Sequence, residues 1–149
     1  KGKINEQLLK ELNNLSFYKL PANTPKSLGK EWVLENVNPL LKKYKLSPQD
    51  ILRTFVEHIA IQITNVLKSK LKGKMLVTGG GAFNKFLISE IQKKTSHKLI
   101  IPDKNTIEFK EALIFAFLGV LRMRNDVNSL KSVTGASENN VGGAVYYGA

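Results

Sequence analysis

Three consecutive glycines, Gly79 to Gly81, follow a short apolar run and precede a segment with helical periodicity. Short apolar runs are typical of buried strands, and apolar residues three and four apart are typical of amphipathic helices. The two patterns alternate in the second half of the chain, over residues 75–78, 84–94, 98–101 and 107–123. This order of strand, helix, strand and helix predicts a parallel βαβ unit, and therefore an α/β fold.

The first half of the chain is expected to be mainly helical. Apolar side chains recur at helical spacing over residues 4–15, 27–44 and 48–71. Pro39 lies inside the second of these helices and is expected to kink or split it. Ser47 and Pro48 favour a helix start, because serine caps a helix and proline fits its first position. These long helices are expected to cover the faces of the sheet, and residues 144–147 are a candidate final strand.

Composition excludes several classes of site. The chain has 149 residues, 42% of them hydrophobic, which suits one globular domain. It has no cysteine, which excludes disulfides and thiolate chemistry, and its two histidines cannot make a His-rich metal site. His58 lies mid-helix among apolar residues and is expected to be a hydrogen-bonded core residue. No apolar run approaches the roughly 20 residues of a membrane helix, and the first five residues contain no apolar h-region, so we expect a cytoplasmic protein, of which this chain is expected to be a part.

The net charge of +11 comes from lysine, since only three of the basic residues are arginine. The densest basic stretch is Lys68–Lys74, at the end of a predicted helix, where cations complement the helix dipole. It contains no aromatic residue to stack on a base. A solvated helix end is therefore favoured over a nucleic-acid or membrane patch, and no nucleic-acid partner is expected.

The glycines allow two interpretations. A ligand could approach the bare backbone closely and meet the positive end of the next helix. The segment could equally be a tight turn, with Asn84 as the helix cap. Glu108 and Glu111 likewise share a helix face, either as acids favoured by the dipole or as a polar site. Lys26 and Ser27 could meet a phosphate or form a capped helix entry.

Six short segments of the chain, taken together and in their order along the sequence, form a specific pattern. They are Gly2-Lys3-Ile4-Asn5 with Leu8-Leu9, residues 25–31 (PKSLGKE), residues 79–84 (GGGAFN), residues 111–118 (EALIFAFL), residues 133–136 (VTGA) and residues 143–146 (GAVY). In this register they resemble the C-terminal part of the anhydro-N-acetylmuramic acid kinases. The resemblance extends over almost the whole chain and is far more specific than a glycine triplet alone.

The resemblance implies a helix-rich C-terminal lobe of the actin-like ATPase and sugar kinase fold, with a small, mostly parallel sheet packed by long helices. Residues 1–149 would form one lobe of a two-lobed kinase, helical over 1–74 and βαβα over 75–149. The parent enzyme would use ATP and Mg²⁺ to convert 1,6-anhydro-N-acetylmuramic acid to N-acetylmuramic acid 6-phosphate in cell-wall recycling, with hydrolytic opening of the anhydro ring.

The resemblance also implies roles for individual residues. Gly79, Gly80, Gly81 and Asn84 would line the adenosine side of the nucleotide site, and Glu111 would accept hydrogen bonds from the sugar. Lys26 and Ser27 would lie at the cleft, on the nucleotide side, without a defined role. The chain itself would hold no catalytic residue and no metal ligand.

The chain departs from the family in what it lacks. The glycine-rich phosphate segment of the family is absent. The Asp-Thr-Gly segment near the catalytic base is absent too, since none of Asp50, Asp103 and Asp126 is followed by Thr-Gly. Leu28 also replaces the usual threonine of the lysine-serine loop. The 149 residues alone are therefore expected not to transfer a phosphoryl group. Alternatives are a basic helical module that binds nucleic acid and an interaction module that pairs through the surface facing the missing lobe, including with a second copy of itself.

Overall fold

A computed structural model describes residues 2–21, 24, 28–68 and 71–146 of the chain. These residues fall into two units, Lys1–Pro102 and Asp103–Ala149, and each unit is treated by itself. The division falls after Pro102 rather than at Lys74, where the sequence pattern changes. The assignment of the whole chain to one kinase lobe stays a prediction. No helix in the described ranges has the length and apolar character needed to cross a membrane.

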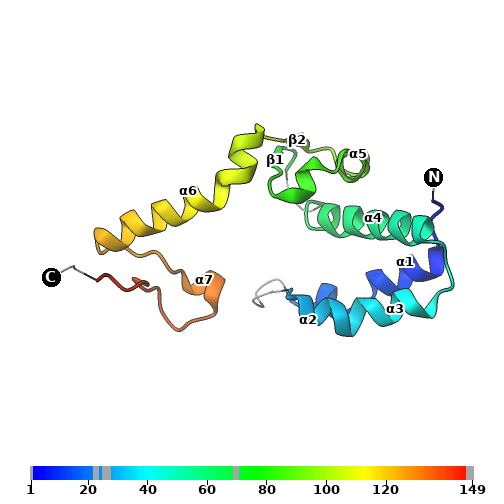
Figure 1. Ribbon diagram of the computed structural model, residues 1–149, viewed down its shortest axis with the longest axis horizontal. Helices are drawn as coiled ribbons and strands as arrows, with labels where there is room; N and C mark the ends of the chain where they lie inside the picture. Colours follow the sequence, from blue (N-terminus) through cyan, green and yellow to red (C-terminus); the bar gives the residue numbers. More distant parts are fainter. Residues whose placement is uncertain (1, 22–23, 25–27, 69–70, 147–149) are drawn as a thin grey trace. The chain divides into compact units, whose positions relative to one another are not determined.

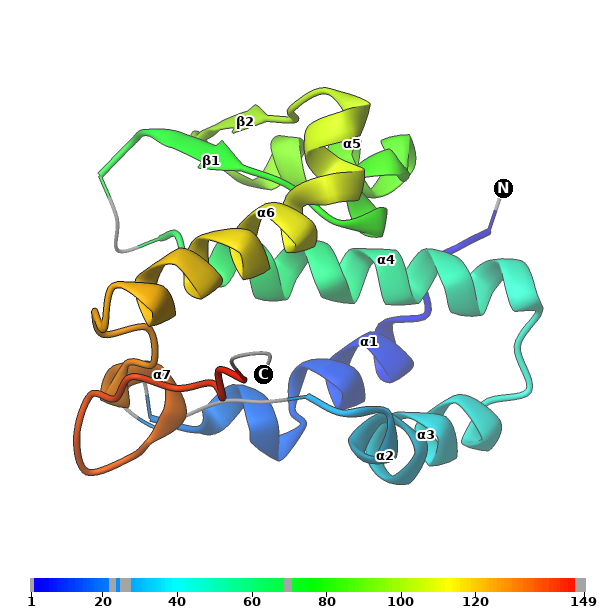
Figure 2. The same ribbon diagram turned by 60° about the vertical axis from the view of Figure 1, so that its left-hand side comes forward.

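The first unit is built around helix α4, Pro48–Asn65. Helix α1, Glu6–Asn13, and helix α5, Lys85–Lys94, pack on it, and α4 lies between them (Figure 1, Figure 2). The predicted start of α4 is confirmed, because Pro48 is its first residue and Ser47 Oγ accepts a hydrogen bond from Asp50 N at 3.2 Å. Local capping chemistry therefore sets where this helix begins.

The helix predicted over residues 27–44 begins only at Lys30 and is continuous to Lys43, but it changes its winding, and Ser27 lies outside the described residues. It consists of α2, Lys30–Trp32, a π-helical turn, Val33–Val37, and α3, Asn38–Lys43. Pro39 has no N–H and crowds the carbonyl four residues earlier, and the wider π turn directly before it accommodates this ring. Pro39 was expected to kink or split the helix, and the structure shows a local change in winding at this point. Val37, in the π turn, joins Leu8 and Leu12 of α1 in the buried core.

Helix α4 ends at Asn65, six residues before the predicted end at Leu71. Val66 is 67% exposed and Leu71 is 95% exposed, so these two apolar positions beyond the helix pack against little of the described chain, whereas Leu67 is partly buried. Helices in proteins are stabilised mainly by packing of an apolar face, which explains the early end. The placement of the Lys68–Lys74 stretch at a helix end is therefore wrong, and its residues 69–70 lie outside the described ranges.

The predicted βαβ unit is confirmed. Strands β1, Lys74–Leu76, and β2, Lys98–Ile100, pair in parallel, and α5 connects them. Val77 N extends the ladder by donating to Ile100 O at 2.9 Å. The expectation that helices cover the sheet is only partly met, because Leu76 is 65% exposed.

The second unit contains α6, Lys104–Met123, and the short helix α7, Lys131–Thr134. Helix α6 begins three residues before the predicted start because Asp103 caps it, accepting from Thr106 N at 3.0 Å. The candidate strand over 144–147 is wrong for its described residues, 144–146, which have no strand pairing. This tail is instead fixed through Asn128, whose Nδ2 donates to Gly142 O at 3.0 Å.

Candidate functional site

The triple glycine forms the turn between β1 and α5. Gly79 has a φ of 81°, a left-handed conformation that favours glycine. A 3₁₀ turn, Gly80–Phe83, follows and is closed by two backbone hydrogen bonds, from Ala82 N to Gly79 O at 3.0 Å and from Asn84 N to Gly81 O at 3.1 Å. We call residues 79–84 the glycine turn.

The glycine turn has open space around the positions that Cβ atoms would occupy on its three glycines. A Cβ atom built on Gly79 or Gly80 would meet no atom within 4 Å, and one on Gly81 would meet only Leu87 Cδ2, at 4.0 Å. The backbone conformation explains glycine at position 79. Neither conformation nor packing within the described chain explains glycine at position 80. An exposed backbone without side chains is what a closely approaching ligand requires.

Asn84 caps α5, since its Oδ1 accepts from Leu87 N at 3.0 Å. The capping interpretation is therefore confirmed, and a ligand contact of Asn84 stays a prediction. The first N–H groups of a helix lack partners within the helix and favour anionic or polar groups. The glycine turn contains no titratable residue. Its chemistry is thus suited to binding a ligand rather than to transferring a proton.

An ion-pair network fixes α5 on α4. Arg53 of α4 binds Glu57 at 3.1 Å and reaches Glu90 of α5 at 2.9 Å, and Lys93 and Lys94 bind the same two carboxylates. Burial raises the pKa of Glu57, but hydrogen bonds from Lys94 and Arg53 outweigh it and lower the pKa overall. Sequence reasoning missed this network. Its local signals were the i, i+4 spacing of Arg53 and Glu57 and the i, i+3 spacing of Glu90 and Lys93.

His58 is a core residue, as predicted. Its ring is 2% exposed, and its nitrogens lie 2.7 Å from Asn13 Oδ1 and 3.0 Å from the Tyr18 hydroxyl. Because Asn13 Oδ1 can only accept, His58 Nδ1 donates to it and Nε2 accepts from Tyr18. Burial lowers the pKa of His58 from 6.5 to about 4, so the ring is neutral near neutral pH.

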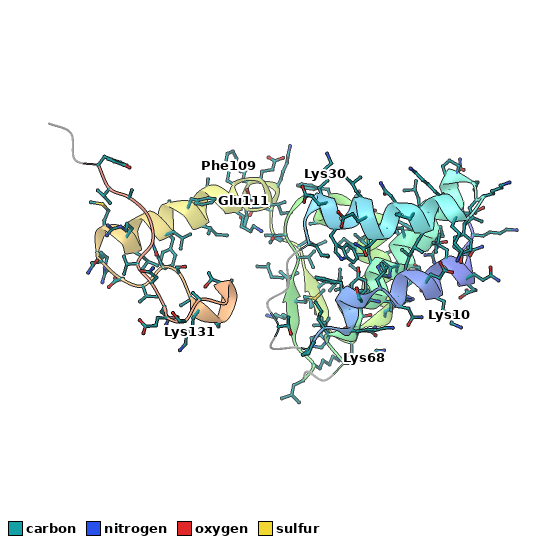
Figure 3. The ribbon with its side chains drawn as sticks, turned by 90° about the horizontal axis from the view of Figure 1, so that it is seen from below. Lys10, Lys30, Lys68, Phe109, Glu111 and Lys131 are labelled. Carbon is teal, nitrogen blue, oxygen red and sulfur yellow. The ribbon has the colours of Figure 1, made fainter. Side chains whose placement is uncertain are left out.

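Glu111 lies on the second turn of α6, near Phe109 (Figure 3). Its side chain is exposed, and it makes no hydrogen bond or ion pair within the described residues, whereas Glu108 pairs with Lys104 at 3.6 Å. Glu111 belongs to the second unit, and within the first unit the structure brings together Gly79, Gly80, Gly81 and Asn84. Lys26 and Ser27 lie outside the described residues.

The three aspartates without a following Thr-Gly each have a structural partner. Asp50 accepts from Lys3 N at 2.6 Å, Asp103 caps α6, and Asp126 pairs with Arg124 at 2.9 Å. Among the described residues, no three His, Asp or Glu side chains are grouped as metal ligands. The donor set of the described chain therefore does not by itself form a metal site.

Comparison with known proteins identifies the family. The family model for anhydro-N-acetylmuramic acid kinase matches residues 1–148. Curated proteins of that name from Hydrogenovibrio crunogenus, Saccharophagus degradans and Haemophilus influenzae are 36%, 33% and 32% identical, over 97–98% of this chain. The match covers 40–42% of their own lengths, so the chain spans about two-fifths of these relatives. The chain belongs to the anhydro-N-acetylmuramic acid kinase family.

Proposed function

We propose that this chain is the nucleotide-binding part of an ATP-dependent kinase that converts 1,6-anhydro-N-acetylmuramic acid and water to N-acetylmuramic acid 6-phosphate. Family membership supports the reaction class. The chain matches only about two-fifths of its relatives, so the complete activity requires the remaining part of the kinase. The enzyme acts in the cytoplasm, in peptidoglycan recycling.

One observation of the structure carries the nucleotide assignment, the open space over Gly80. In this proposal Gly79, Gly80 and Gly81 let the adenosine part of ATP lie against bare backbone, and Asn84 lies at its edge while capping α5. ATP supplies the phosphoryl group. Mg²⁺ enters with the phosphates, which suits an ion that binds through few protein ligands and keeps several waters.

Glu111 is proposed to accept hydrogen bonds from the sugar hydroxyls. Its carboxylate is exposed and unpaired within the described chain, while the carboxylate one turn earlier is neutralised by Lys104. The fold proposed for the complete kinase is the two-lobed, actin-like one, with ATP between the lobes and this chain as the C-terminal lobe. Lys26 and Ser27 are proposed to lie at the nucleotide side of that cleft.

The test of the nucleotide site uses a chimeric kinase, in which residues 1–149 replace the matched two-fifths of the Hydrogenovibrio crunogenus protein. Gly80→Leu places a side chain where the structure has no atom within 4 Å, so folding should be unaffected. The KM for ATP should rise roughly tenfold or more, because the added side chain occupies the ligand's place, while the KM for the sugar stays the same.

Gly73→Leu is the matched control, since a Cβ there meets only an ordinary contact, Leu71 O at 3.8 Å, away from the glycine turn. Its KM for ATP should equal that of the unmodified chimera. An unchanged KM for ATP in Gly80→Leu would remove the glycine turn from the nucleotide site. A folded chimera that does not phosphorylate the anhydro sugar would refute the proposed reaction.

A further inference from the structure

Helix α6 is apolar on a side that its own unit does not cover. Ile107 is 6% exposed and Leu118 and Leu121 are partly buried. A second set of apolar residues repeats every four and three positions along another side of the helix. We call this set the α6 seam: Phe109 (64% exposed), Leu113 (69%), Ala116, Val120 (55%) and Met123 (65%).

The seam borders a groove of about 530 Å³. Gly119 and Ala116 form part of its wall on α6, and Ala144 and Val145 of the tail line it opposite. Arg122 holds the tail in place, because its Nε donates to Gly143 O at 2.7 Å. A Cβ atom on Gly119 would meet nothing within 4 Å, so the backbone of α6 is open to close approach by another element there.

A helix that is apolar on all sides is stable when it is buried on all sides. Spacing of four and three residues is that of a seam against a packed neighbour, and small residues let the neighbour approach closely. An exposed apolar surface of this kind marks an interaction site.

We propose that the α6 seam docks the part of the kinase that this chain does not match. Relatives that match almost the whole chain are about two and a half times as long, so roughly three-fifths of the kinase has to pack somewhere. Two copies of the chain would bring together two bodies of charge +11, which disfavours self-pairing. This inference rests on the proposed function, because the occupant is the remainder of that same kinase.

The test compares hydrogen exchange of the α6 amides in the isolated chain and in the chimeric kinase, without ATP or sugar. The amides around the seam should exchange roughly tenfold or more slowly in the chimera, because burial suppresses local opening. The apolar dye 8-anilinonaphthalene sulfonate should bind the isolated chain and lose its binding in the chimera.

Gly119→Leu separates docking from folding. In the isolated chain it should leave the circular dichroism spectrum unchanged, since leucine favours helices and its Cβ meets no atom. In the chimera it should restore fast exchange and dye binding. When residues 1–149 and the remainder of the Hydrogenovibrio kinase are expressed as two chains, the unmodified chain and Gly73→Leu should co-purify with the remainder, and Gly119→Leu should not.

Equal exchange of α6 in the isolated chain and the chimera would overturn the proposal. So would a dimer of the isolated chain that buries the seam and that Gly119→Leu dissociates, which would make a second copy the occupant. A chimera that protects α6 but does not phosphorylate the sugar would support docking and refute the proposed function. A chimera that phosphorylates the sugar with α6 unprotected would refute docking alone.

Discussion

At the scale of single residues, His58 shows how a polar group is kept in the core. It is almost fully buried, yet both ring nitrogens have partners, and Gln62 Nε2 donates to the same Asn13 Oδ1 at 2.8 Å. Burial disfavours the charged form of the ring, because a buried charge loses its hydration, and this lowers the pKa of His58. The folded state therefore depends on a neutral His58.

This dependence predicts how stability changes with pH. Between pH 6.5 and about 4 the unfolded chain binds a proton at His58 that the folded chain does not bind. Lowering the pH through this window should therefore cost the wild type up to about 3 kcal/mol of unfolding free energy. Because glutamine does not titrate, His58→Gln should lose this part of the pH dependence of the unfolding free energy. The variant should also be less stable than the wild type at pH 7. Urea denaturation at pH 7, 5.5 and 4 measures it.

The carboxylates with lowered pKa, Glu57 and Glu90 among them, lose their stabilising contribution below about pH 4.5 in both proteins, so this part of the pH dependence cancels in the comparison. Parallel curves for wild type and His58→Gln would show that His58 is not the group responsible.

At the scale of secondary-structure elements, the position of the glycine turn depends on how α5 sits on α4. Arg53 joins the two helices through Glu57 and Glu90, and its guanidinium also lies 5.4 Å from the centre of the Phe86 ring. Both carboxylates are nearly buried, at 10% and 7% side-chain exposure. Because Asn84 both caps α5 and ends the glycine turn, this interface also holds the candidate site.

Arg53→Met should therefore destabilise the chain by about 1–3 kcal/mol, since two nearly buried carboxylates lose their hydrogen bonds to the shared guanidinium and keep only their lysine partners. Lys43→Met is the control, because it breaks the exposed Lys43–Glu11 pair and should change the thermal midpoint little. Differential scanning calorimetry of both variants measures the difference. Equal midpoints for Arg53→Met and Lys43→Met would show that the network does not hold α5 on α4.

At the scale of the whole molecule, the two parts of the proposed active site lie in different units. The glycine turn belongs to the first unit and Glu111 to the second. The described residues contain no group of three metal-ligating side chains. These features suit a chain that contributes binding groups to a larger kinase, and we expect the isolated 149 residues to show no activity in its assays.

Glu111→Gln in the chimeric kinase should lower kcat/KM for the anhydro sugar about 10- to 100-fold, because hydrogen bonds to a charged acceptor contribute about 1.5–3 kcal/mol. The KM for ATP should not change. Glu108→Gln, one turn earlier and paired with Lys104, is the control and should match the unmodified chimera. Sugar kinetics of Glu111→Gln equal to those of Glu108→Gln would remove Glu111 from the sugar site.

The sequence by itself determined the features that depend on neighbouring residues. The βαβ order, the glycine turn between its first strand and helix, and the start of α4 at Ser47 and Pro48 all follow from local periodicity and capping. The glycine turn could be proposed as a site for the same reason, since three glycines between strand and helix are a local signal.

Only the tertiary structure decided which of these local preferences persist and which polar groups are buried. The end of α4 at Asn65 depends on whether Leu71 finds a packing surface, and the partner of His58 is 45 residues away, at Asn13. The broad apolar character of α6 is visible in the sequence, but the seam that stays uncovered is not. The physical reason is that burial depends on contacts between distant segments, which local periodicity does not encode.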